Sequence, residues 1–247
     1  MLDSQIQKHK TAAKKLDFIK NKAFIFIKKN IDKASEYDVN RFILSEFKKE
    51  GMITQKEYPA QIISFGQNTS IVHYYPKANS SKIMHKDNLV LVDIWAKLNE
   101  KDAPFADITW MGYTGRNIPQ EIRKAFWLVI GAREEAIRFL RKKLKDKKLP
   151  RSIEIERAVR NYFDKFGIEK YFTHGVGHSL GITQNHGTYF RFSKKSKSRL
   201  RLNIPFTIEP GLYFKNRFGI RSEIDCYITQ DYKLIVTTKV QKNIIRI

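Results

Sequence analysis

The sequence has a single cysteine, no long hydrophobic run and far fewer acidic than basic residues, and each shortage excludes something. The lone thiol, Cys226, can form no internal disulfide, which favours a reducing compartment such as the cytoplasm. No apolar stretch approaches the roughly eighteen residues that a transmembrane helix needs. The basic N-terminus also lacks the apolar segment of a secretory signal. We therefore expect a cytoplasmic protein with no membrane partner.

Positive charge is in large excess: 47 Lys and Arg residues stand against 25 Asp and Glu, a formal net charge of +22 in 247 residues. Two clusters carry much of it, RKKLKDKKLPR at 141–151 and RFSKKSKSRLR at 191–201. Neither cluster alternates with aromatic residues as a platform for single-stranded nucleic acid would. Because lysine is also spread over the rest of the chain, the sequence favours a solvated basic surface with nonspecific attraction to polyanions over a specific nucleic-acid site.

Several segments have helical patterns. One begins near Ser35, where Ser35 and Asp38 have the spacing of a capping box, and ends at Gly51. Another opens after Pro119, which suits a first helical turn, and the charged run that follows its apolar stripe is expected to extend or cap it. The predicted helices cover residues 4–30, 35–51, 119–148 and 152–166.

Strand-like segments dominate elsewhere, at residues 62–75 (two strands joined by the turn GQNTS), 88–95, 202–214, 219–229 and 232–240. Helices and strands occur in separate runs and not in regular β-α-β alternation, which predicts an α+β fold. No low-complexity linker divides the chain. We therefore expect residues 1–247 to form a single catalytic domain.

Two aspartates stand at strand positions. Asp93 in LVLVD follows Leu89 and Leu91 at the two-residue period, so one face of this strand changes from aliphatic to acidic at the strand end. An unpaired carboxylate beside such neighbours carries a large desolvation cost, which a bound cation would remove. Asp107 in ADIT resumes a strand after Pro104. Taken singly, each aspartate is explained as well by an exposed position.

Three further candidates complete a set. Glu209 precedes Pro-Gly, which ends a strand and fixes where the carboxylate points. Glu223 in GIRSE shares a strand face with Arg221, so a solvated ion pair between them is the plain alternative. His178 lies in HGVGHSLG. Four carboxylates and one imidazole make a hard donor set that suits Mn²⁺, Fe²⁺, Co²⁺ or Zn²⁺ and carries enough charge for two ions.

The pieces ADIT, HGxGHxxG, EPG and GxRxE occur in the order that is typical of the pita-bread metallopeptidases, and the chain resembles this family over residues 73–223. The family includes methionine aminopeptidases, prolidases and Xaa-Pro aminopeptidases; the chain is most like the last branch. The resemblance implies two similar halves around a curved antiparallel sheet covered by helices. It also implies a metallo-aminopeptidase that acts on peptides with a free N-terminus.

The resemblance assigns roles to the five candidates. Asp93 would chelate one of two divalent metal ions, Asp107 and Glu223 would bridge both, and His178 with Glu209 would complete the shell of the other. A metal-bridging water would attack the carbonyl of the N-terminal peptide bond, with Glu209 as general base or proton carrier.

The remaining histidines divide into two groups. His73 matches the family's histidine near the substrate amide, His174 the pocket histidine of prolidase-like members, and His186 the histidine that contacts the scissile carbonyl. Such imidazoles can donate hydrogen bonds or shuttle protons, so we expect these three to be catalytic. His9 and His85 lack such a context and are expected at the surface.

The chain also departs from the family pattern. The separation of Asp93 and Asp107 is three residues longer than usual, which an extra loop between the strands would absorb. The separation of His178 and His186 is one residue longer, which leaves the register of His186 open. Trp110 stands where many relatives have arginine or a small polar residue, and it predicts a different pocket rim.

The leading interpretation is an exopeptidase for Xaa-Pro peptides, with a homodimer suggested by analogy to prolidases. Three alternatives stay open: a methionine aminopeptidase-like activity, a non-catalytic pita-bread protein that binds RNA or ribosomes through its basic surface, and a hydrolase of small amidines. The full set of ligand types disfavours the last two.

Overall fold

A computed structural model of the protein describes residues 1–55 and 61–247. It contains every predicted helix, with ends shifted by a few residues. The helices are α1 (Asp3–Lys29), α2 (Glu36–Lys49), α3 (Gln120–Lys145) and α4 (Ser152–Asp164), with short 3₁₀ turns η1 (Gly66–Ser70) and η2 (Glu169–Tyr171). Strands fill much of the remaining chain, and the predicted α+β class is confirmed.

Local sequence explains where the helices begin. The backbone N–H of Asp38 donates to Ser35 Oγ at 3.2 Å, and the N–H of Ser35 donates to Asp38 Oδ2 at 2.9 Å, so the capping box of α2 is confirmed. Pro119 precedes α3 as its N-cap residue. The apolar stripe predicted for α3 is buried throughout. The basic run beyond it adds the last turn, which ends at Lys145.

Within the described residues the strands form three mostly antiparallel sheets. In the first sheet β2 pairs with β3 beside the order β1-β3-β4-β12, the second sheet has the order β11-β10-β7-β5-β6, and β8 pairs with β9. Their bounds are β1 Met52–Ile53, β2 Ile62–Phe65, β3 Leu89–Leu98, β4 Ala106–Tyr113, β5 Gly177–Leu180, β6 His186–Phe192, β7 Phe206–Ile208, β8 Gly211–Phe214, β9 Phe218–Arg221, β10 Ile224–Ile228, β11 Leu234–Val236 and β12 Ile245–Arg246.

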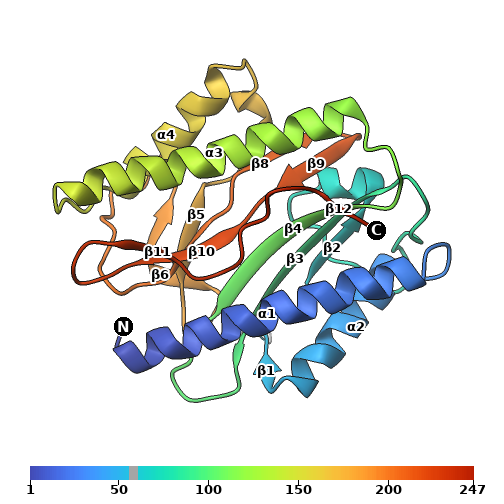
Figure 1. The fold of residues 1–247 in the computed structure, drawn as a ribbon, viewed down its shortest axis with the longest axis horizontal. Helices are drawn as coiled ribbons and strands as arrows, with labels where there is room; N and C mark the ends of the chain where they lie inside the picture. Colours follow the sequence, from blue (N-terminus) through green and yellow to red (C-terminus); the bar gives the residue numbers. More distant parts are fainter. Residues whose placement is uncertain (56–60) are drawn as a thin grey trace.

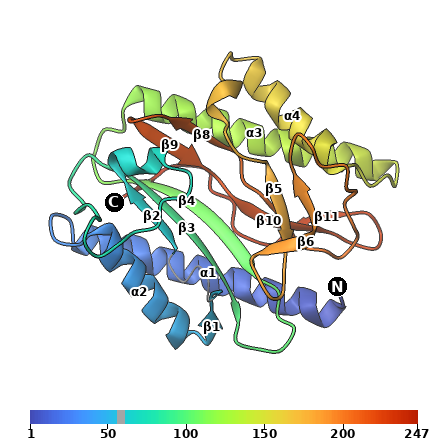
Figure 2. The same ribbon diagram turned by 180° about the vertical axis from the view of Figure 1, so that it is seen from behind.

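Helices α1 and α3 run across the same side of the strands (Figure 1), and the opposite view shows the strands in front of them (Figure 2). One apolar core joins α1 and α2 to one face of β3 and β4, and the other joins α3 and α4 to the second sheet. On β3 the side chains of Val90, Val92 and Ile94 enter the first core. Asp93 therefore belongs to the opposite face, which is not covered by α1 and α2.

Two strand predictions in the first sheet need correction. The strand that carries Asp93 does not end there: β3 continues to Leu98, and Asp93 pairs with Ile62 on one side and Thr109 on the other. The segment 62–75 forms one strand, β2, and not two, because GQNTS is the 3₁₀ turn η1. The buried carboxylate of Glu36 explains this, since it accepts hydrogen bonds from the backbone N–H groups of Phe65 and Lys82 and holds the segment in a loop.

The predicted strand 219–229 is also interrupted. β9 ends at Arg221 and β10 begins at Ile224, so Ser222 and Glu223 belong to neither. The chain changes partners here, because β9 pairs with β8 whereas β10 pairs with β7. The backbone N–H of Glu223 donates a hydrogen bond to the carbonyl oxygen of Thr109 in the first sheet, at 3.4 Å. This crossing point places Glu223 between the two sheets.

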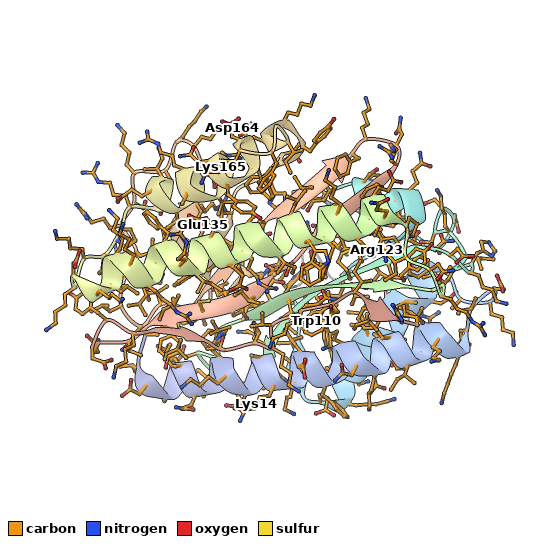
Figure 3. All side chains as sticks on the ribbon, turned by 45° about the horizontal axis from the view of Figure 1, so that its top comes forward. Lys14, Trp110, Arg123, Glu135, Asp164 and Lys165 are labelled. Atoms are coloured by element: carbon orange, nitrogen blue, oxygen red, sulfur yellow. The ribbon has the colours of Figure 1, made fainter. Side chains whose placement is uncertain are left out.

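Two side chains lie where the sequence did not predict them. Trp110 points to the α1 side of β4 (Figure 3), where Lys20 Nζ lies 3.5 Å from the ring centroid, so it is not part of the pocket rim. His9 is fully buried and not at the surface: its Nδ1 donates to the carbonyl oxygen of Phe105 at 2.8 Å. His85 is exposed, as expected. Among the described residues, no helix is both long and apolar enough to cross a membrane.

Candidate metal centre and its pocket

A pocket of about 690 Å³ lies where the two large sheets meet, and it gathers the candidates that the sequence had scattered over 150 residues. The five predicted metal ligands and the three predicted catalytic histidines all line it. They are Asp93, Asp107, His178, Glu209 and Glu223, with His73, His174 and His186. No member of the predicted set lies elsewhere in the molecule.

The antiparallel pairing of β3 and β4 explains why the first two acids meet. Asp93 stands opposite Thr109 and Trp95 opposite Asp107, so all four side chains share one face of the strand pair. The extra loop that separates the strands, residues 99–105, lies beyond this register and leaves it intact. The long spacing between the two aspartates is therefore accommodated as predicted.

The second sheet supplies the other three candidates. His178 is on β5, Glu209 follows β7, and Glu223 occupies the break between β9 and β10. Gly177 permits the close packing of β5 on β7, because a Cβ there would clash with the backbone carbonyl of Thr207. The glycine before His178 in HGVGH thus has a steric reason.

Asp107, His178 and Glu223 are buried, and each offers a ligand atom within 4.8 Å of the others. The Nδ1–H of His178 donates to the carbonyl oxygen of Ser179 at 3.1 Å, so its Nε2 lone pair faces the acids. This is the tautomer that a metal-binding imidazole needs. Asp107 Oδ1 is buried and has no hydrogen-bond partner among the described residues. The donor types and this free oxygen fit a divalent cation.

Asp93 and Glu209 flank this cluster differently. Asp93 forms a buried ion pair with Arg221, so Arg221 is the partner of Asp93 and not of Glu223 as the sequence suggested. Glu223 Oε2 instead accepts a hydrogen bond from Thr109 Oγ1 at 2.7 Å. Glu209 Oε1 lies 3.4 Å from His178 Nε2. Asp93 and Glu209 thus extend the central three ligands toward a larger site.

Burial makes the free acids costly to ionise. It raises the pKa of Asp107 and Glu223 well above the ordinary carboxyl range, and repulsion from neighbouring acids, above all Asp93 for Asp107 and Asp107 for Glu223, adds to this. It raises the pKa of Glu209 to about 7. Burial also raises the pKa of Asp93, although the Arg221 guanidinium opposes the shift. Such a group of acids is stabilised by a cation, which supplies the missing positive charge.

The imidazoles in the pocket are held neutral. Burial lowers the pKa of His178 well below its usual value, that of His174 to about 3 and that of His186 to about 4. The ring of His186 lies over that of His178 with centroids 3.9 Å apart, which settles its orientation toward the pocket. His73 is exposed overall, and partial desolvation of its ring, with the charge of Arg221, lowers its pKa as well.

His174 is more constrained than the sequence suggested. Its Nδ1–H donates to the carbonyl oxygen of Gly175 at 2.8 Å, and its Nε2 is 2.9 Å from the hydroxyl of Tyr213. Arg221 Nη1 donates to the same hydroxyl at 3.0 Å. The Tyr213 O–H can therefore donate to His174, which links this histidine through Arg221 to Asp93.

Two pocket residues were missed by the sequence analysis. Asn185 is buried; its Nδ2 donates to Asp107 Oδ2, while its Oδ1 has no partner among the described residues. Arg191 stands opposite His178 in the β5–β6 pair and lines the pocket. Only its place in a basic cluster could have drawn attention to Arg191. The extra residue before His186 could have drawn attention to Asn185.

The sequence model of metallopeptidase family M24 matches residues 7–230, and the chain belongs to this family. A putative dipeptidase, YkvY of Bacillus subtilis, is 29% identical over 95% of this chain. The crystal structure of a prolidase from Thermococcus sibiricus superposes with a TM-score of 0.80 at 26% identity over the whole chain. An X-prolyl aminopeptidase of Caenorhabditis elegans gives a TM-score of 0.74 at 18% identity over 97% of this chain. The pita-bread fold is therefore confirmed.

These relatives are longer than the chain. It spans 59% of the Bacillus subtilis protein, 62% of the Thermococcus sibiricus prolidase and 39% of the Caenorhabditis elegans enzyme. The similarity therefore establishes the family and the fold of this segment.

Proposed function

We propose that residues 1–247 form one metallopeptidase catalytic domain that removes the N-terminal residue from Xaa-Pro peptides with the help of two divalent metal ions. The observation that carries this proposal is the convergence of four acids and one imidazole, drawn from both sheets, on a single pocket. The prolidase and X-prolyl aminopeptidase among the similar structures support the Xaa-Pro preference. The latter is described as a cytosolic enzyme with a di-nuclear active site, which supports the same location and metal number here.

The residues divide between the two ions. Asp107, His178 and Glu223 would hold one ion, since their ligand atoms already converge. Asp93 would hold the other together with the shared acids Asp107 and Glu223, and Glu209 would complete the shell on the His178 side. Bound Mn²⁺, Co²⁺, Fe²⁺ or Zn²⁺ would supply Lewis acidity, which makes water a nucleophile at neutral pH and stabilises negative charge on a peptide carbonyl oxygen.

Glu209 is the residue proposed to move the proton. In the metal-free protein, burial raises the pKa of its carboxyl group to about 7. A carboxylate in this position can take a proton from the attacking water and pass it to the leaving amine nitrogen. Its Oε1 lies beside His178 Nε2 and so faces the centre of the site.

The histidines are proposed to orient the substrate. His73 and His186 line the pocket as neutral imidazoles, so either can donate one hydrogen bond to a peptide carbonyl oxygen. Both ring nitrogens of His174 are engaged by Gly175 and Tyr213. We therefore assign His174 the task of holding the Tyr213–Arg221–Asp93 chain in place, and not contact with the substrate.

Arg191 suits the other end of the substrate. Its guanidinium lines the pocket beside His178 and forms no ion pair with any described residue. A carboxylate is the ligand that a free guanidinium binds best. A C-terminal carboxylate held there would favour short peptides. Arg191→Gln should raise KM for a dipeptide roughly tenfold or more and leave a longer, amidated peptide nearly unchanged; equal effects on both would contradict this assignment.

The proposed reaction is tested with chelated protein that is reloaded with Mn²⁺ or Co²⁺. We expect release of alanine from Ala-Pro and Ala-Pro-Gly, slower release from Ala-Ala, and two bound ions per chain by elemental analysis. Preferential release of methionine from Met-Ala-Ser would favour the methionine aminopeptidase alternative instead. No turnover of any of these peptides with metal bound would contradict the proposal. Sedimentation of the loaded protein tests the proposed homodimer.

A further inference from the structure

The two basic clusters of the sequence meet in space, outside the pocket. The N–H of Ser152 donates to the carbonyl oxygen of Ser198 at 2.8 Å, and the N–H of Leu200 donates to that of Pro150 at 3.1 Å. Arg151 and Arg199 form the bridge between these two segments. The segment between α3 and α4 is thus joined to the loop between β6 and β7, which brings the clusters at 141–151 and 191–201 together.

Charge is concentrated on this surface beyond what the composition requires. Residues 141–151 hold seven basic residues and one acid, and residues 191–201 hold six basic residues and none. These 22 positions therefore contribute +12 of the net charge of +22. Basic residues spread evenly over the chain would place only a small share of the charge in these positions.

Most of these side chains have no counter-ion. We define the basic face as the exposed residues of the two clusters that form no ion pair with any described residue. Lys143 and Lys194 are excluded because they pair with Glu154 and Glu169, and Arg191 because it lines the pocket. The basic face consists of Arg141, Lys142, Lys145, Lys147, Lys148, Arg151, Lys195, Lys197, Arg199 and Arg201.

Part of this charge has a structural explanation. Lys142 and Lys145 lie in the last turn of α3, where cations offset the negative end of the helix dipole. That effect reaches only the final turn. It does not account for the cations beyond the helix or for those of the 195–201 segment.

An aromatic ring accompanies the cations. Tyr189 on β6 is 40% exposed, and the Arg201 guanidinium lies 5.1 Å from its ring centroid. An exposed ring next to unpaired cations can stack on a nucleic-acid base while the cations contact phosphates. No other residue among the exposed large hydrophobics of the described chain lies in residues 141–151 or 186–201. Insertion into a lipid bilayer, which uses such side chains, is therefore disfavoured.

We propose that the basic face and Tyr189 together bind single-stranded nucleic acid through its phosphate backbone. This function is separate from peptide hydrolysis, because no residue of the basic face lines the pocket. The charges would bind by displacing counter-ions from the strand, so affinity should fall steeply as salt rises. The stacked ring would add affinity that salt affects little.

The test measures fluorescence anisotropy of a labelled oligouridylate of about 20 nucleotides at about 50 and 200 mM salt. Each phosphate contact contributes roughly 0.7 to the slope of log affinity against log salt, so five contacts predict about a 100-fold loss over this range. Replacing Lys145, Lys147, Lys148, Lys195 and Lys197 by Gln should remove most of that slope and weaken binding at low salt at least about tenfold. Tyr189→Ala should weaken binding about fivefold or more with the slope unchanged.

A matched control separates the basic face from net charge. Lys28, Lys33, Lys48, Lys77 and Lys86 are exposed, lie outside both clusters and form no ion pair with any described residue. Their replacement by Gln changes the net charge equally and should leave binding within about twofold. Equal losses in both variants, or no binding at low salt, would overturn the proposal. So would tighter binding to phosphatidylserine–phosphatidylcholine vesicles than to the oligonucleotide. Unchanged thermal unfolding of each variant confirms that it is folded.

Discussion

The pocket and the basic face contain charges of opposite sign, and the protein treats them in opposite ways. In the pocket, Asp107 and Glu223 are withdrawn from water with few cationic partners, and burial raises the pKa of both. On the basic face, cations stand in water without counter-ions. Water solvates and screens the exposed cations, so leaving them unpaired costs little free energy. The first is costly unless a bound ion supplies the charge, which is why only the pocket implies a cofactor.

The difference also concerns geometry. Pocket acids come from several strands, and each direction is fixed by sheet pairing, a strand break or a hydrogen bond such as that from Thr109 Oγ1 to Glu223. Lysines of the basic face come from a helix end and a loop, and their side chains are not held. A substitution in the pocket should therefore have large, specific consequences, and one at the surface small, salt-dependent ones.

The largest effect is expected from Glu223→Gln, which keeps the shape of the side chain and removes its charge. Activity should fall by more than the roughly 100-fold that loss of an outer-shell partner costs. The rise in Tm on addition of Mn²⁺ should disappear. Without metal, Tm should not fall, because burial already favours the neutral carboxyl. Calorimetry with and without Mn²⁺ measures both.

Glu100→Gln is the control for that substitution, since Glu100 is an exposed acid paired with Lys8. It should bind metal and hydrolyse peptides as the wild type does. If Glu223→Gln retained the Mn²⁺-dependent rise in Tm, the assignment of Glu223 as a ligand would be wrong.

The next effect concerns the buried ion pair. Arg221→Met leaves the Asp93 carboxylate without its partner in the interior, which typically costs about 3–5 kcal/mol of stability. Urea unfolding in a chelating buffer measures it. The double variant with Asp93→Asn should recover much of the loss, because no uncompensated charge is then left. A loss of less than about 1 kcal/mol in the single variant would show that the pair is exposed to water.

A third effect is a change of stability with pH. The pKa of Glu209 is raised from 4.5 to about 7 on folding, so folding favours its protonated form. Its contribution is fully present below pH 4.5 and is lost as pH rises through 7. Relative to Glu209→Gln, the metal-free wild type should therefore lose on the order of 2 kcal/mol of stability between these limits. Urea unfolding of both proteins at pH 5 and pH 8 measures the difference.

Comparison with the variant is needed because two histidines of the pocket act in the other direction. Burial lowers the pKa of His174 and His186, so their contribution is present above pH 6.5 and lost as pH falls. These residues are the same in both proteins and largely cancel in the difference. A difference that does not change between pH 5 and pH 8 would contradict the raised pKa of Glu209.

The sequence predicted the helices and the members of the pocket well, because both leave local signals. Ser35 and Asp38 mark the start of α2, and short motifs surround Asp107 and Glu209. The partners of these residues were harder to predict. Arg221 shares a strand period with Glu223, yet it pairs with Asp93, 128 positions earlier in the chain. The strand break at Ser222 turns Glu223 toward Thr109, and no pattern within the segment announced it.

Local sequence patterns also could not predict which distant segments cover a given side chain. His9 has charged neighbours in sequence and reads as a surface residue, but the loop that carries Phe105 and the segment at Thr237 enclose it. Trp110 is one residue from Thr109, and the two-residue period of β4 turns it toward α1. The joining of two basic clusters likewise depends on backbone hydrogen bonds between segments nearly 50 residues apart.

The smallest effect is expected at the edge of the basic face, where Lys143 Nζ lies 2.7 Å from Glu154 Oε1. A distance this short is also found in buried ion pairs, but the side chains of Lys143 and Glu154 are 37% and 33% exposed. Lys143→Gln should therefore cost no more than about 0.5 kcal/mol, and the cost should vanish in about 1 M salt. Urea unfolding at both salt concentrations checks this. A loss comparable to that of Arg221→Met would mean that distance, and not burial, sets the strength of ion pairs in this protein.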